Sequence, residues 1–307
     1  MQAKFQTHNR IFVGSVWTCA LLLLAATLTV QAQYNYITLN VPGAVATTAT
    51  GISGNKIVGW YYTGTSYQSF LYNGSTYTTL SVPGATATYA TGIDGNNIVG
   101  YYSSGSGNRG FLYNGSTYTT LNVPGATGTY ANGIDGNNIV GEYYGGGSWR
   151  GFRYNGSSYT TLSVPGATST SAAGIDGNNI VGYYDNGSSD LAFLYNGSTY
   201  TTLNVPGAVS QTFGADISGN NVVGQYYTGS SWRSFLYNGS SYITLSAPGA
   251  LNTYAQGIDG NYIVGSYDFG GNQRGFLAIP VPEPSASGLL AVGAAAILIR
   301  RRRKLAA

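Results

Sequence analysis

Carboxylates that could bind a metal or catalyse hydrolysis recur at one fixed place in this sequence. They belong to copies of a Gly-Ile-Asp-Gly motif, in two of which serine replaces aspartate: Asp94, Asp135, Asp176, Asp259, Ser53 and Ser218. A catalytic site is normally built once, whereas Asp beside Gly commonly bends a turn with its own side chain. We therefore predict turn-forming residues. Calcium is the alternative, but the sequence Asp-Gly-Asn-Asn supplies fewer oxygen ligands than a calcium loop.

Two other acidic features are candidates for a site. Asp185 and Asp190 lie five residues apart in DNGSSD, the least repetitive polar stretch, and are a candidate calcium site. Glu142 is the only glutamate between residues 33 and 280. A glycosidase needs two carboxylates on either side of the scissile bond, and the sequence does not place a partner for Glu142. A glycan-cleaving enzyme is kept as an alternative, and no catalytic residue, metal or cofactor is assigned.

Three residue types that carry much enzyme chemistry occur only near the N-terminus. The single histidine, cysteine and methionine are His8, Cys19 and Met1. If residues 1–32 are removed, the remaining sequence contains no imidazole, thiol or thioether. This excludes histidine general bases, Ser-His-Asp triads, cysteine nucleophiles, His/Cys metal sites and disulfides from that part of the chain.

Aromatic and arginine side chains are the candidates for ligand binding. We expect the variable loops between the second and third strands of each repeat to carry them: Trp60, Trp149, Arg150, Trp232 and Arg233. Indole faces stack on sugar rings and guanidinium groups donate hydrogen bonds, so the expected partner is an extracellular polysaccharide. For the Ser-Trp-Arg triplets at 148–150 and 231–233, packing between repeats is an equally good interpretation.

The charge of the central segment argues against nucleic acid as a partner. Residues 33–280 contain six basic and nine acidic side chains, a formal balance of 6 − 9 = −3, although the whole chain is +3. Nucleic-acid binding requires clustered Lys and Arg that displace counterions from phosphates. No such cluster occurs in this segment.

A repeat of about 41 residues organises the segment. Its Pro-Gly-Ala motifs place prolines at 42, 83, 124, 165, 206 and 248. Each unit reads as four short strands, and four strands per 40 residues are typical of a β-propeller blade. The stretch FLYNGSTYTTL, found three times, predicts the outer hairpin. Its Asn114-Gly115 pair favours a type I′ turn, which would set Phe111 opposite Tyr118.

The two ends of the repeat region are complementary halves. Residues 34–44 resemble a fourth strand that lacks the first three, and residues 257–279 supply inner strands that lack a fourth. We predict a six-bladed propeller over residues 33–280, closed by its N-terminal strand, which protects an edge that would otherwise be exposed. Another all-β repeat arrangement is the alternative. The motif GIDGNNIVG followed by AFLY, SFLY or GFLY resembles HAF-type extracellular repeats, for which no activity is implied.

Residues 1–32 have the pattern of a secretory signal peptide. Lys4 and Arg10 precede an apolar stretch over 11–30, and Val30-Gln31-Ala32 offers small residues before a cleavage point. An uncleaved anchor helix is the alternative. The interpretation predicts that the repeat region is exported.

The C-terminal residues 281–307 form a three-part tail. Val281-Pro282-Glu283-Pro284 precedes an apolar stretch over 285–299, which is followed by Arg300, Arg301, Arg302, Arg303 and Lys304. An apolar segment followed by positive charge stops in the inner membrane with its charges in the cytoplasm. Fifteen helical residues span only about 22 Å, which suits a transient anchor. A permanent C-terminal anchor is the alternative.

This tail resembles the PEP-CTERM sorting tails of Gram-negative bacteria, and similar tails close some ice-binding proteins. The resemblance implies recognition and cleavage by an exosortase, and a link to exopolysaccharide and biofilm matrix at the cell surface. We therefore expect a structural or adhesive matrix protein that binds polysaccharide. A protein-binding scaffold is a further alternative.

Overall fold

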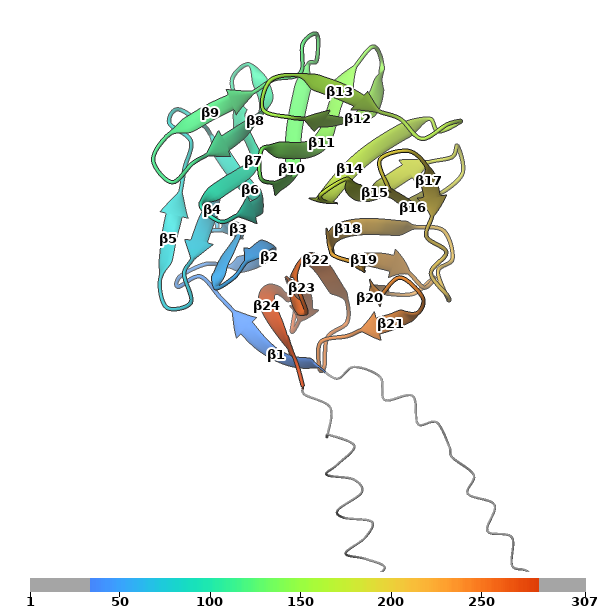
Figure 1. Cartoon of the computed structure of the whole chain (residues 1–307). Coiled ribbons are helices and arrows are strands. Elements are labelled where there is room, and N and C mark those ends of the chain that lie inside the picture. Colours follow the sequence, from blue (N-terminus) through green and yellow to red (C-terminus); the bar gives the residue numbers. More distant parts are fainter. Residues whose placement is uncertain (1–33, 282–307) are drawn as a thin grey trace, which may run out of the picture. The chain divides into compact units, whose positions relative to one another are not determined.

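The computed structural model describes residues 34–281, and its regular structure is entirely β-strand. Twenty-four strands form six four-stranded antiparallel sheets arranged around a central axis (Figure 1). The six-bladed propeller predicted from the repeat is therefore confirmed. The predicted signal peptide and the C-terminal helix lie outside the described residues.

The blades follow one another in chain order. Blade 1 contains β2 (Ala46–Ser53), β3 (Lys56–Tyr62), β4 (Tyr67–Tyr72) and β5 (Tyr77–Leu80). Blade 2 contains β6 (Ala87–Asp94), β7 (Asn97–Ser104), β8 (Gly107–Tyr113) and β9 (Tyr118–Leu121). Blade 3 contains β10 (Gly128–Asp135), β11 (Asn138–Gly145), β12 (Ser148–Tyr154) and β13 (Tyr159–Leu162). Blade 4 contains β14 (Ser169–Asp176), β15 (Asn179–Asp185), β16 (Asp190–Tyr195) and β17 (Tyr200–Thr202).

The last two blades complete the ring. Blade 5 contains β18 (Thr212–Ser218), β19 (Asn221–Tyr227), β20 (Trp232–Tyr237) and β21 (Tyr242–Leu245). Blade 6 contains β22 (Thr253–Asp259), β23 (Tyr262–Phe269), β24 (Asn272–Pro280) and the N-terminal strand β1 (Tyr34–Leu39). The first strand of each blade lies nearest the axis in Figure 1, and the fourth forms the rim.

The propeller has two distinct ends along its axis. One end, which we call the turn end, carries the turns between first and second strands and the loops between third and fourth strands. The loop end carries the loops between second and third strands and the connections from each blade to the next. Because β1 starts where β24 stops, with Tyr34 opposite Pro280, both ends of the described chain lie at the turn end.

Strand β1 closes the ring as a true fourth strand. It pairs antiparallel with β24 along its whole length, from Tyr34↔Pro280 to Leu39↔Gly275. In each blade the Thr that precedes the final Leu of the fourth-strand motif shares a hydrogen bond with a second-strand tyrosine, as Thr120 Oγ1 does with the Tyr102 hydroxyl at 3.1 Å. Thr38 Oγ1 makes the same bond with the Tyr267 hydroxyl at 2.9 Å, across the two ends of the chain. The predicted closure is confirmed.

The outer hairpin forms where it was predicted, but its turn and register differ. Tyr113 lies opposite Tyr118, and the four residues between them form the loop. The prediction of Phe111 opposite Tyr118 was wrong, since Phe111 pairs with Thr120 and reaches the Tyr118 ring diagonally, with centroids 5.6 Å apart.

The type I′ turn was also wrong, because among the described residues only glycines have positive φ. Asn114 Oδ1 instead accepts the Ser116 and Thr117 amides at 3.0 and 2.9 Å. This side chain gives the loop the partners that a two-residue turn would have provided.

Each blade packs around one phenylalanine and one glycine. The third-strand phenylalanines are fully buried: Phe70, Phe111, Phe152, Phe193, Phe235 and Phe276. Beneath Phe111 lies Gly100, where a Cβ atom would stand 2.0 Å from the Tyr89 carbonyl oxygen and 2.8 Å from Phe111 Cε1. The repeated Ile-Val-Gly therefore ends in glycine because no other residue fits between the first strand and the aromatic ring.

Candidate functional site

The aspartates of the Gly-Ile-Asp-Gly motif join neighbouring blades at the turn end. Asp94 Oδ2 accepts the Gly136 amide of the next blade at 2.8 Å, and Ser53 Oγ accepts the Gly95 amide at 3.0 Å. The remaining copies, with Asp259 returning to Gly54 of blade 1, complete a ring of six such bonds of 2.5–3.0 Å. The prediction that each side chain bends its own turn was therefore wrong in this detail, since each caps the turn of its neighbour.

This ring predicts a graded effect of substitution. Asp94→Ala leaves the Gly136 amide without its acceptor and should lower stability by about 1 kcal/mol. For a chain of this size that corresponds to a melting temperature about 2–4 °C lower. Asp94→Ser is the matched control, because serine holds the same bond in blades 1 and 5, and it should retain most of the stability in thermal melts. Equal losses for Ala and Ser would contradict the role given to this bond.

A β-bulge in every first strand directs one side chain into the central channel. The register shifts at this residue in each blade, between Ala131 and Gly133 for example. Bulges typically re-aim a side chain in this way. The bulged residues are Thr50, Thr91, Asn132, Ala173, Ala215 and Gln256. Thr91 Oγ1 donates to the Ala131 carbonyl of the next blade at 2.7 Å, and Asn132 Nδ2 donates to that of Ala172 at 2.9 Å.

Asp216 breaks the six-fold repeat of this channel. The residue after the bulge is glycine in the other five blades: Gly51, Gly92, Gly133, Gly174 and Gly257. Asp216 Oδ1 accepts the Ile217 amide and Oδ2 accepts the Ile258 amide of blade 6, each at 2.9 Å. Burial raises the pKa of Asp216 to about 7 despite these two bonds, and the nearby carboxylates of Asp176 and Asp259 raise it further.

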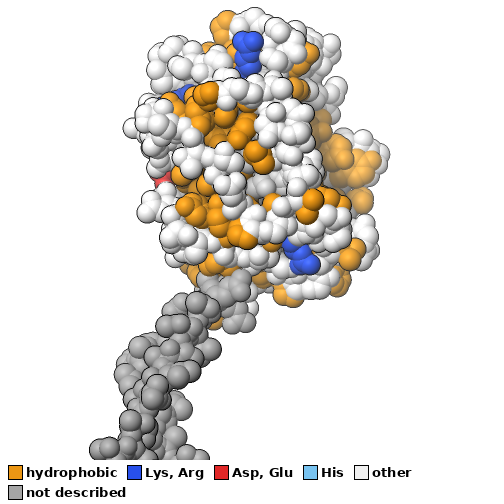
Figure 2. All heavy atoms as spheres, turned by 90° about the vertical axis from the view of Figure 1, so that its right-hand side faces the viewer, with side chains coloured by type: hydrophobic (Ala, Val, Ile, Leu, Met, Phe, Trp, Pro, Cys, Tyr) orange, Lys and Arg blue, Asp and Glu red, His pale blue; other side chains and the backbone are white. Residues whose placement is uncertain are grey.

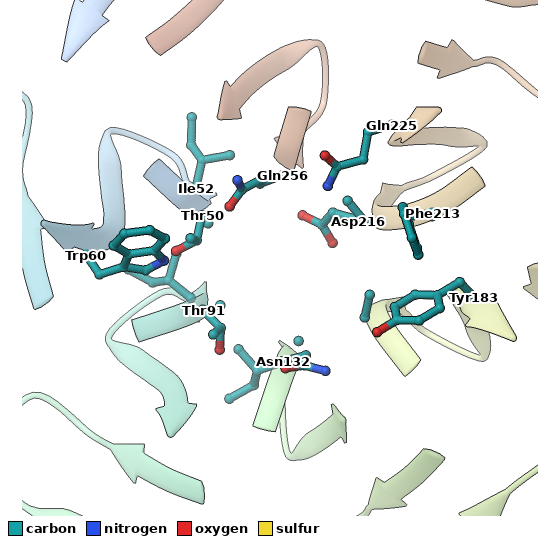
Figure 3. Close-up of a pocket in the computed structure, with 18 residues that line it drawn as sticks. Thr50, Ile52, Trp60, Thr91, Asn132, Tyr183, Phe213, Asp216, Gln225 and Gln256 are labelled. Atoms are coloured by element: carbon teal, nitrogen blue, oxygen red, sulfur yellow. The ribbon is translucent and has the colours of Figure 1, made fainter. Parts of the chain in front are cut away.

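The channel encloses a pocket of about 410 Å³. Figure 3 shows Asp216, Gln225 and Gln256 grouped on one side of it, with Thr50, Thr91 and Asn132 around the remainder. The aromatic side chains of Trp60, Tyr183 and Phe213 form further parts of the pocket wall. Sequence reasoning missed Asp216, Gln225 and Gln256. The signal was available, because these residues stand where the aligned repeats differ.

The three tryptophans of the described chain lie in an aromatic layer toward the loop end. One arc runs through blades 1 to 3, with successive ring centroids 4.8–6.1 Å apart from Trp60 through Tyr89, Tyr101 and Tyr130 to Trp149. A second arc runs from Tyr183 through Phe213 and Trp232 to Tyr254. The layer therefore contributes to packing between blades.

The predicted binding residues lie on strands rather than in loops, which corrects that part of the prediction. Trp60 is on β3, Trp149 and Arg150 are on β12, and Trp232 and Arg233 are on β20. Of the three tryptophans only Trp149 is well exposed, at 38%, and it contacts Tyr144, which is 39% exposed. Trp232 is less exposed, and its backbone amide donates to Asn252 Oδ1 at 2.8 Å. The structure therefore distinguishes the two Ser-Trp-Arg triplets, which the sequence did not.

Each arginine directly follows a tryptophan in the sequence, and Arg150 is exposed whereas Arg233 is partly buried. Arg150 Nε donates to Ser148 Oγ at 3.3 Å, within its own triplet. Arg233 Nη1 donates to Ser246 Oγ at 3.0 Å. Both guanidinium groups keep further N–H donors for a ligand.

The remaining acidic candidates, Asp185, Asp190 and Glu142, each have a different hydrogen-bond partner. Asp185 and Asp190 face each other across β15 and β16, but Asp185 Oδ2 accepts Thr168 Oγ1 at 2.8 Å while Asp190 Oδ2 accepts Gln211 Nε2 at 3.3 Å. Among residues 34–281 no group of three or more His, Cys, Asp or Glu side chains could hold a metal ion. Burial raises the pKa of Glu142, and a hydrogen bond with Ser171 of the next blade opposes this shift.

The outer surface carries few charges. On the rim shown in Figure 2, uncharged polar and apolar side chains predominate, and the Lys and Arg side chains stand apart from one another. This face therefore offers no basic patch for a polyanion. In the part of the chain that the structure describes, there is also no helix long and apolar enough to span a membrane.

Solved structures share the fold at low sequence identity. The β-propeller domain of the Trilobed protease from Pyrococcus furiosus superposes with a TM-score of 0.50 and 11% identity, over 83% of this chain and 88% of that one. The tricorn protease gives a TM-score of 0.50 and 13% identity, over 73% of this chain and 24% of that one. At this identity the likeness shows the propeller fold alone. No curated protein matches the sequence.

The C-terminal tail matches a known sorting signal. Residues 280–303 fit the family model described as the PEP-CTERM protein-sorting motif, which confirms that resemblance. The motif is consistent with an exosortase as the processing partner. The chain thus combines a β-propeller with a PEP-CTERM tail, which implies export, transient membrane anchoring and then association with the surface.

Proposed function

We propose that this propeller is a non-enzymatic matrix protein that binds an extracellular polysaccharide at its loop end. The proposal includes export from a Gram-negative-type cell, removal of the tail by an exosortase, and membership of the HAF-type repeat proteins. It places the protein in the exopolysaccharide and biofilm matrix, as a structural or adhesive component.

The observation that carries the proposal is the aromatic surface of blade 3. Trp149 packs between Tyr130 and Tyr144, with centroid distances of 5.4 and 5.3 Å, and still exposes 38% of its surface. Rigid exposed aromatic rings lose little conformational entropy when they bind. Arg150 follows on the same strand and is exposed. Successive side chains of a strand point to opposite faces, so the exposed indole is itself the contact surface. An exposed indole face suits the apolar face of a sugar ring.

The place where the described chain ends supports display of this surface. The last described residue, Val281, follows Pro280 at the turn end. Trp149 lies at the opposite end, beside the loop between β11 and β12. An anchor at the tail would therefore leave the loop end directed away from the attachment point.

Substitution of Trp149 tests the proposal. Residues 33–281 can be purified as a unit, because every described strand finds its partner within this range. We expect saturable retention of this propeller on the host's exopolysaccharide. Trp149→Ala should weaken retention about tenfold, equivalent to about 1.4 kcal/mol and typical of a lost aromatic anchor.

Tyr262→Ala is the matched control, because Tyr262 is 47% exposed but lies at the turn end. It should leave retention unchanged. Failure of the wild-type propeller to bind any glycan would contradict the proposal and favour a protein-binding scaffold. Release of new reducing ends from the glycan, abolished by Glu142→Gln, would favour a glycan-cleaving enzyme instead.

A further inference from the structure

The central pocket differs in chemistry from the exposed aromatic surface of blade 3. It lies on the propeller axis, where every blade contributes its bulged residue and four of the six also contribute the residue after it. Four glycines and two alanines keep much of this wall free of larger side chains. Polar side chains concentrate on blades 5 and 6, in Asp216, Gln225 and Gln256 (Figure 3). A purely structural channel would repeat in every blade, and this one does not.

The polar side of the pocket offers unused hydrogen-bonding groups. Among the described residues, the side-chain amides of Gln225 and Gln256 have no hydrogen-bond partner, although both side chains are only partly exposed. Each carboxylate oxygen of Asp216 accepts one backbone amide and keeps further acceptor capacity. Asn132 uses its amide nitrogen for the Ala172 carbonyl and keeps its side-chain oxygen.

The apolar side of the pocket is aromatic. Trp60 lies on one side of the opening, and Tyr183 and Phe213 lie on the other (Figure 3). The Tyr183 and Phe213 rings pack edge to face with centroids 4.7 Å apart, which fixes their position. The pocket volume falls in the range typical of small-molecule sites.

Taken together, these groups select for a neutral hydroxylated ligand. No Lys or Arg lines the pocket, so an anion would meet Asp216 without compensation. A calcium ion needs six or more oxygen ligands and usually several carboxylates, whereas one carboxylate is present here. Hydroxyl groups both donate and accept, which matches two amides and a carboxyl group. A carboxyl group whose pKa lies near 7 can itself donate in its protonated form.

We propose that this pocket binds a single neutral sugar residue at the end of a polysaccharide chain, with Asp216, Gln225 and Gln256 as its polar contacts. The inference rests on the proposed function in taking a polysaccharide as the source of that sugar. It adds a second site, on the axis, that recognises chain ends, while the surface around Trp149 contacts the chain along its length.

The repeat itself supplies the variants for a test. Asp216→Gly installs the residue found in the other five blades, and Gln256→Thr installs the residue of blades 1 and 2. Both changes should therefore preserve the fold, which melting temperature checks. Asp94→Ser is the matched control, because it removes a carboxylate that lies outside the pocket and does not affect the pKa of Asp216, and because serine keeps the bond to the next blade.

Calorimetric titration of residues 33–281 with glucose, galactose and mannose, and with short neutral oligosaccharides cut from the retained polysaccharide, measures the site. We expect saturable one-to-one binding that weakens at least tenfold in Asp216→Gly and in Gln256→Thr, and stays unchanged in Asp94→Ser and Trp149→Ala. Polysaccharide retention without saturable binding of these sugars would overturn the pocket and leave the proposed function standing. Sugar binding that persists when retention fails would support the pocket and overturn the surface around Trp149. Binding that is unchanged in Asp216→Gly, or that requires added calcium, would also overturn the inference.

Discussion

A propeller that lacks residues 33–44 is expected to lose cooperative folding. These residues include β1, whose pairing with β24 is the only sheet contact between the two ends of the described chain. Their removal deletes the buried side chains of Leu39 and Val41. It also deletes Tyr36, whose ring packs against that of Phe276 with centroids 5.2 Å apart. Each lost aliphatic side chain costs about 2–5 kcal/mol, against a total stability of about 5–15 kcal/mol for a typical domain. Circular dichroism melts of the truncated propeller should show no sharp transition.

Two further measurements distinguish ring closure from a general effect of truncation. Ile37→Thr changes an exposed residue of β1 to the residue found at the same place in blades 1 to 4, and it should leave the melt unchanged. A synthetic peptide of residues 33–44 should restore the transition when added to the truncated chain. A truncated propeller that melts at the wild-type temperature would contradict closure by β1.

The substitution Gly100→Ala should destabilise the propeller by about 3 kcal/mol or more. Its Cβ atom would lie 2.0 Å from the Tyr89 carbonyl oxygen and 2.9 Å from the Ala90 Cα atom, and both contacts are with backbone. A flexible side chain could move aside, but here the first strand itself must shift away from the second. Overpacking in a well-packed core typically costs about 1–3 kcal/mol, and a backbone clash places this change at or above that range. Denaturant titration measures the loss.

Gly105→Ala provides the matched control within the same blade. Gly105 lies in the loop after β7, has no atom within 4 Å of an added Cβ, and does not require positive φ. Its replacement should change stability by no more than about 0.5 kcal/mol. If the two alanine variants unfold at the same denaturant concentration, the explanation for the glycine in every Ile-Val-Gly is wrong.

The fold could be predicted from the sequence because its repeat marks each strand and its ends are complementary. The period places four strands in each unit, and residues 34–44 predict closure before any contact is known. Local register was less predictable. The Asn114-Gly115 pair favours a two-residue turn, yet the side chain of Asn114 binds the Ser116 and Thr117 amides and lengthens the loop. The longer loop forms because the Asn114 side chain supplies hydrogen bonds that compete with the backbone bonding of a two-residue turn.

The candidate site could be predicted only in part, because its residues are defined by geometry between blades. Trp149 is identifiable as an exposed aromatic candidate, but the sequence does not separate it from Trp232, whose amide is held by Asn252 of the next blade. The Gly-Ile-Asp-Gly aspartates attract attention as repeated carboxylates, yet they join neighbouring blades. Asp216 replaces the first glycine of the Gly-Ile-Asp-Gly motif in blade 5, a difference that is visible in the aligned repeats but has no evident role in the sequence alone. Its position on the channel wall becomes evident only in the structure, where the bulges align it with the five equivalent glycines around the axis.

Tryptophan fluorescence of the exported propeller is the measurement that tests polysaccharide binding most directly. Of the four tryptophans in the chain, Trp17 lies in the first 32 residues, and Trp60, Trp149 and Trp232 all belong to the aromatic layer near the loop end. The emission of residues 33–281 therefore reports on this layer alone. Titration with the host's exopolysaccharide should produce a saturable change in emission that is reduced in Trp149→Phe and unaffected in Tyr262→Ala. Emission that stays constant through the titration, at concentrations where the polysaccharide is in large excess, would contradict binding at the loop end.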